Sequence, residues 1–98
     1  MGLQTVQHQT EQIVEILTQH GHMQVAATLQ AAVQQLYDEQ LRVSALETIQ
    51  HHCHVKWLGD LSIPSLSWSA WWGMLHTLKK AVQRELKRLS PSDVINGL

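Results

Sequence analysis

The sequence has a single cysteine, Cys53, and no phenylalanine among its 98 residues. One cysteine cannot form a disulfide within the chain, and this is typical of proteins from a reducing compartment. Charged residues make up only 15% of the chain, below the share of about 25% in ordinary globular proteins. The formal net charge of −1 argues against a nucleic-acid binder that relies on bulk electrostatics.

Long apolar runs and targeting signals are also missing. No apolar stretch approaches the roughly 20 residues that cross a bilayer, the first residues lack the pattern of a signal peptide, and Val6 breaks the myristoylation motif. We therefore expect a cytoplasmic protein. Catalytic patterns such as G-x-S-x-G, H-E-x-x-H and paired carboxylates are absent, as are glycine-rich phosphate loops. We expect no enzymatic activity.

What the sequence does contain favours a mainly α-helical fold. Apolar residues make up 44% of the chain, which is enough for one core in a domain of common size. Glutamine, a polar residue compatible with helices, recurs through the first half. We predict one helical domain over residues 1–90 and a flexible C-terminal tail over residues 91–98.

Apolar spacing of three and four residues predicts three helices. The first runs over residues 4–20, and Gly21 ends it with a left-handed backbone. The second runs over residues 22–49 without an interrupting glycine or proline and forms an antiparallel hairpin with the first. The third is a Trp-rich amphipathic C-terminal helix over residues 67–89, capped by Ser65 or Ser67.

The predicted second helix is long enough to extend beyond the first. In that extension the apolar residues spread around most of the helix instead of forming one stripe. They are Leu41, Val43, Ala45, Leu46 and Ile49. Because the first helix cannot reach them, the third helix or another subunit must cover them. We therefore predict a homodimeric helical bundle.

The segment between the second and third helices breaks the helical pattern. A possible short β-hairpin is predicted near residues 55–63, with Gly59 at the first position of a two-residue turn. Pro64 would confine this hairpin to an edge. The alternative is an irregular loop held by Trp57.

A run of four potential metal ligands precedes this segment. Histidine and thiolate bind zinc, nickel and copper, but neighbouring residues point in different directions, so at most two of these donors can converge on one ion. A complete site would need the same segment of a second chain across a two-fold axis. The alternative is a polar helix end in which Cys53 packs as a small apolar residue. The run is His51, His52, Cys53 and His54.

The four tryptophans fall within sixteen residues, and three of them start the third helix. Tryptophan is a frequent anchor of protein interfaces, although a stripe of this kind is also ordinary core. Lys79 falls inside the same apolar arc and could pair with Glu47 at an interface or extend to solvent. The predicted partner-binding residues are Trp68, Trp71, Trp72, Lys79, Leu41 and Leu46.

Three functions remain open from the sequence. The first is a non-enzymatic protein-interaction or regulatory module that acts as a homodimer and needs no cofactor. The second is a transition-metal-binding or sensing protein that uses residues 51–54 across a dimer. The third is nucleic-acid or anionic-membrane binding through a basic face of the third helix. We expect neither partner, because four surface cations on an ordinary amphipathic helix usually form a solvated face. That face comprises Lys80, Arg84, Lys87 and Arg88.

Overall fold

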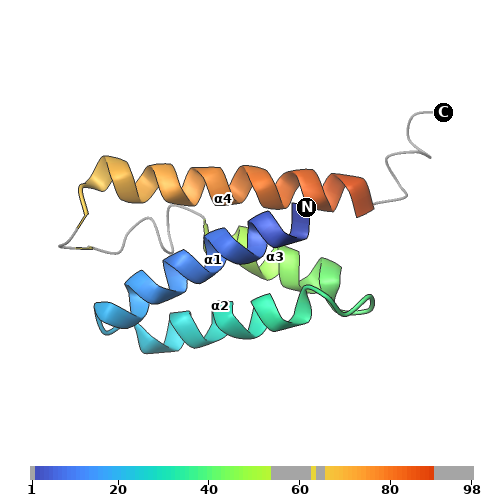
Figure 1. The fold of residues 1–98 in the computed structure, drawn as a ribbon, viewed down its shortest axis with the longest axis horizontal. Helices are drawn as coiled ribbons and strands as arrows, with labels where there is room; N and C mark the ends of the chain where they lie inside the picture. The colour runs from blue at the N-terminus through green and yellow to red at the C-terminus, as the bar shows by residue number, and fades with distance from the viewer. Residues whose placement is uncertain (1, 54–62, 64–65, 90–98) are drawn as a thin grey trace.

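The computed structural model describes residues 2–53, 63 and 66–89. These residues form four helices and no strand, which confirms the predicted mainly α-helical fold. The predicted hairpin near residues 55–63 and the predicted tail over residues 91–98 lie outside the described residues, apart from the buried Ile63. The helices are α1 (Gly2–Gln19), α2 (Met23–Gln35), α3 (Arg42–His52) and α4 (Trp68–Leu89) (Figure 1).

A tight turn joins α1 to α2, and the two helices run in opposite directions (Figure 1). Gly21 has a φ of +84°, the left-handed conformation predicted for it. Its N–H donates to the carbonyl of Thr18, while the N–H of His22 donates to the carbonyl of Leu17 at 2.8 Å. These two bonds are the pattern of a Schellman motif, which satisfies the last carbonyls of α1.

The chain turns between α2 and α3, so the prediction of one uninterrupted helix over residues 22–49 is wrong. Asp38 accepts a hydrogen bond from the N–H of Gln40 through Oδ1 at 2.9 Å, and its carbonyl accepts from the N–H of Arg42 at 2.8 Å. Aspartate competes with the helical pattern through such local bonds. The Nε of Arg42 closes the turn by donating to the carbonyl of Leu36 at 2.8 Å.

Because of this turn, α3 folds back into the bundle and packs against α2 and α4 instead of extending beyond α1 (Figure 1). Ala45, Leu46 and Ile49 are fully buried by their own chain, whereas Leu41 and Val43 remain exposed. The overhanging second helix, from which we predicted a dimer, is therefore absent. Any case for pairing must come from another surface.

The core lies between the four helices, where α1 and α3 each pack against both α2 and α4. Ser67, one of the two predicted capping residues, caps the start of α4. Its Oγ accepts a hydrogen bond from the N–H of Ala70 at 3.1 Å. α1 contributes one buried polar residue, Thr10, whose hydroxyl donates to the carbonyl of Val6 at 2.7 Å. The largest fully buried side chains include Trp71, Ile13, Leu17, Leu29, Leu36, Leu46, Ile49 and Leu78.

Candidate functional site

The three tryptophans at the start of α4 occupy two different environments. Trp71 is 1% exposed and belongs to the core, whereas Trp68 is 62% exposed and Trp72 is 37% exposed. Residues four apart on a helix are neighbours on its surface. The rings of Trp68 and Trp72 stack accordingly, with 5.9 Å between their centroids and 23° between their planes. This stacked pair is an exposed aromatic surface, hereafter the Trp68–Trp72 pair.

The sequence around the Trp68–Trp72 pair carries no formal charge. Residues 66–78 contain no aspartate, glutamate, lysine or arginine, and His76 is their only ionisable side chain. The basic residues of α4 begin at Lys79. α4 is therefore divided along its length into a neutral first half with exposed aromatic rings and a basic second half.

The other predicted partner-binding residues do not join the Trp68–Trp72 pair in one surface. Leu46 is fully buried in α3, and Trp71 is buried in α4. Leu41 is exposed, but the link between α2 and α3 lies at the end of the bundle opposite the start of α4 (Figure 1). A partner that covers both regions would have to extend along the whole molecule.

Lys79 lies on the inner side of α4, half-buried and close to Cys53. Burial raises the pKa of the Cys53 thiol to about 12, and the nearby Lys79 charge lowers it only in part. Glu47 is exposed, and within the described residues it forms no ion pair with Lys79. A pairing of these two charges between subunits stays a prediction.

The described part of the predicted metal run does not converge on one point. His51 is exposed, while a ring N–H at Nδ1 of the half-buried His52 donates to the carbonyl of Thr48 at 2.7 Å. The buried Cys53 keeps its proton at neutral pH, whereas metals bind the thiolate. Among the residues that the structure describes, no three histidine, cysteine or acidic side chains are placed to hold one ion. His54 lies outside them.

The basic face of α4 is exposed at all four predicted residues, Lys80, Arg84, Lys87 and Arg88. One of these charges is partly compensated, because Nη1 of Arg88 lies 3.3 Å from Oε2 of Glu85. Glu85 itself is only 8% exposed and lies against Gly2 at the start of α1. Sequence analysis missed this burial, because helical spacing alone does not show that the first turn of α1 covers this side of α4.

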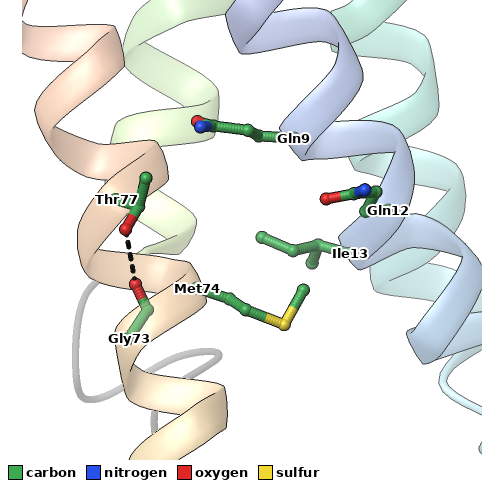
Figure 2. Close-up of a pocket in the computed structure, with 6 residues that line it drawn as sticks. All are labelled: Gln9, Gln12, Ile13, Gly73, Met74 and Thr77. Carbon is green, nitrogen blue, oxygen red and sulfur yellow. Dashed lines mark hydrogen bonds between the residues drawn. The ribbon is translucent and has the colours of Figure 1, made fainter.

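A cavity that sequence analysis did not predict lies between α1 and α4 (Figure 2). Its volume is about 330 Å³, and each helix contributes residues at the spacing that places them on one face. The sequence contained one signal for it, a glycine inside α4, where alanine would stabilise the helix. The lining residues are Gln9, Gln12, Ile13, Gly73, Met74 and Thr77.

No protein-family model, curated protein or solved structure matches this chain. Of the helices within the described residues, none combines the length and apolar character needed to cross a bilayer. Function is therefore inferred from the residues and their geometry alone.

Proposed function

We propose that the protein is a non-enzymatic helical interaction module that acts as a homodimer, and that the Trp68–Trp72 pair forms the contact between the two copies. The exposure of this stacked pair carries the proposal. Tryptophan rings bury a large apolar area, and tryptophan is enriched among the residues that contribute most to interface affinity. Stacking also fixes both rings before binding, which reduces the entropy lost on association.

The absence of charge in residues 66–78 supports a second copy of this chain as the partner. In a two-fold symmetric dimer the same patch faces itself, so any charge near the axis meets its own copy. Like charges that meet in an interface weaken binding by several kcal/mol. A neutral aromatic patch avoids this repulsion, whereas a nucleic acid or anionic membrane would need cations beside the tryptophans.

The two alternative functions have weaker support. Metal binding through residues 51–54 has no geometric support within the described residues, where no three potential ligands are placed to hold one ion. Binding of anionic partners through the second half of α4 would use Arg88, which already lies beside Glu85. The metal alternative does not account for the exposed Trp68–Trp72 pair.

Native mass spectrometry and analytical sedimentation test the proposal by comparing the mass of the wild-type chain with that of the double variant Trp68→Ala/Trp72→Ala. We expect the wild-type chain to be a dimer at micromolar concentration and the double variant to be a folded monomer. Leu41→Ala is the matched control, because Leu41 is also an exposed apolar residue but lies at the other end of the bundle. We expect it to remain dimeric.

Two results would contradict the proposal. One is a wild-type chain that stays monomeric at high micromolar concentration, and the other is a double variant that keeps the dimer mass. Repeating the measurement with a chelator separates the metal alternative, since loss of the dimer on chelation would assign the pairing to the histidine run instead.

A further inference from the structure

His76 is the one ionisable side chain in the uncharged segment that carries the Trp68–Trp72 pair. It is exposed and lies four residues after Trp72, which in turn lies four residues after Trp68. Residues at this spacing are neighbours on a helix surface, so the three side chains follow one another along one exposed strip of α4. A partner that covers the Trp68–Trp72 pair therefore lies against His76 as well.

The charged residues of α4 closest to His76 are both cations. Lys79 and Lys80 follow it by three and four residues, the spacing that makes them its neighbours on the helix. The acidic residue of α4 is Glu85, which lies more than two turns further along and is already beside Arg88, with 3.3 Å between Oε2 and Nη1. A proton on His76 would thus add a positive charge next to two others.

α3, which packs against α4, brings titratable groups but no negative charge to this region. The Cys53 thiol lies close to Lys79, and because burial raises its pKa to about 12, it is neutral where histidine titrates. His51 and His52 precede it at the end of α3. Histidines gain positive charge on acidification, so these two add to the repulsion.

α1 is the other helix that packs against α4. Glu11 and Glu15 of α1 and Glu47 of α3 are the acidic residues that the structure describes on these two helices, and all three are exposed without an ion pair to α4. The side chains that face α4 across the cavity cannot compensate a charge either (Figure 2). They are Gln9, Gln12 and Ile13.

We propose that protonation of His76 dissociates the dimer, so that two copies pair near neutral pH and separate in mildly acidic solution. This inference rests on the proposed function, because it needs the Trp68–Trp72 pair to be the dimer contact. In a two-fold dimer each charge on the patch meets its own copy, so protonation places two new cations at the contact. Their repulsion and their loss of hydration outweigh what an imidazolium gains from a tryptophan ring.

Proton linkage gives the direction of the effect. His76 binds a proton more readily in the free chain than in the dimer, so dissociation takes up one proton per chain. The monomer is therefore favoured as the pH falls through the interval in which histidine changes charge, about pH 5–8. The dimer is favoured above that interval.

The test measures the dimer Kd by analytical sedimentation at about pH 8 and about pH 5, the limits of histidine titration. The wild-type Kd should rise roughly tenfold or more on acidification. His76→Gln is neutral at both pH values and should keep one Kd. His76→Lys is charged at both and should weaken the dimer roughly tenfold already at about pH 8.

Two variants of other exposed histidines are the matched controls. His8→Gln on α1 and His51→Gln on α3 remove a titrating ring outside the strip that carries the tryptophans. Both should keep the wild-type response to pH. Circular dichroism at the two pH values shows whether the separated chains remain folded.

The outcomes distinguish this inference from the proposed function. A wild-type dimer whose Kd stays constant or falls on acidification overturns the role of His76 and leaves the dimer standing. A His76→Gln variant that still dissociates in acid, or a His76→Lys variant that pairs like wild type at about pH 8, does the same. A wild-type chain that is monomeric at both pH values overturns both proposals.

Discussion

The carboxylate of Glu85 in α4 lies against Gly2, the first residue of α1, so closely that a side chain at Gly2 would overlap it. The N-terminus of a helix carries a partial positive charge and favours a carboxylate beside it. Nη1 of Arg88 lies 3.3 Å from Oε2 of the same carboxylate. Glu85 therefore packs the second half of α4 against the start of α1.

Substitution by alanine should change the free energy of unfolding in opposite directions at Gly2 and Gly73. Gly2→Ala should lower the free energy of unfolding by about 1 kcal/mol, because the new methyl group displaces the Glu85 carboxylate. Gly73→Ala should raise it by about 0.5–1 kcal/mol, because the helix gains and nothing lies within 4 Å of the new Cβ. Urea denaturation followed by circular dichroism measures both changes.

A double variant identifies the cause of the Gly2→Ala effect. If the clash with Glu85 is the reason, Gly2→Ala should cost almost nothing in a chain that already carries Glu85→Ala. Contacting residues typically give such non-additive changes. If Gly2→Ala lowers the free energy of unfolding equally in wild type and in Glu85→Ala, the clash with Glu85 is not the cause of the effect.

Trp71 and Trp68 should differ sharply in what they contribute to stability. Trp71→Ala should lower the free energy of unfolding by about 3–5 kcal/mol, since removal of a buried tryptophan leaves a large cavity. Trp68→Ala should change the stability of the monomer by less than about 1 kcal/mol, because that ring is mostly exposed. Urea unfolding at low protein concentration keeps association out of the comparison, and similar losses for both variants would contradict the burial pattern.

Cys53 should make the protein less stable in alkaline solution. Above pH 9.0 an unfolded thiol loses its proton, whereas the buried thiol keeps it until about pH 12. The unfolded state therefore binds fewer protons in this interval, and stability falls by at most about 1.4 kcal/mol per pH unit. Below pH 9.0 the thiol is protonated in both states, so its contribution does not change.

The comparison that checks this effect is wild type against Cys53→Ala, because the other groups of the chain contribute equally to both proteins. The difference in unfolding free energy between the two proteins should be constant up to pH 9.0 and shrink above it. In folded wild type, thiol reagents should react slowly at neutral pH and rapidly after denaturation. A constant difference over the whole range, or rapid modification of the folded protein, would contradict the burial of Cys53.

The parts of the fold that follow from local sequence were predicted correctly. Gly21 ends α1, and Ser67 starts α4, because a left-handed glycine and a serine cap act within a few residues of themselves. The apolar stripe of α1 is buried at Val6 and Ile13 as its spacing indicates. These features need no knowledge of the rest of the chain.

The parts that were not predicted rest on weak local signals or on contacts between distant residues. The α2–α3 turn rests on Asp38 and Arg42, and neither has the strength of a proline or glycine as a helix breaker in sequence. The division between buried Trp71 and exposed Trp68 depends on which side of α4 the other helices cover. The same holds for the cavity at Gly73, since α1 and α4 are far apart in the chain.

The turn between α2 and α3 provides the most direct test of the corrected topology. Asp38→Ala removes the acceptor for the N–H of Gln40, and Arg42→Met removes the donor to the carbonyl of Leu36 while keeping the apolar stem. Each change should lower the free energy of unfolding by about 1 kcal/mol, the net value of one hydrogen bond. Glu39→Ala is the matched control, because Glu39 is exposed in the same turn, and it should leave stability unchanged.

Circular dichroism of these variants distinguishes the two topologies. If the turn is needed to bring α3 back onto α4, the helical signal of Asp38→Ala should stay at or below the wild-type value as stability falls. A single straight helix would behave differently, because alanine has a higher helix propensity than aspartate. An increase in both helical signal and stability would therefore favour the uninterrupted helix and return Leu46 and Ile49 to the surface that a second subunit would have to cover.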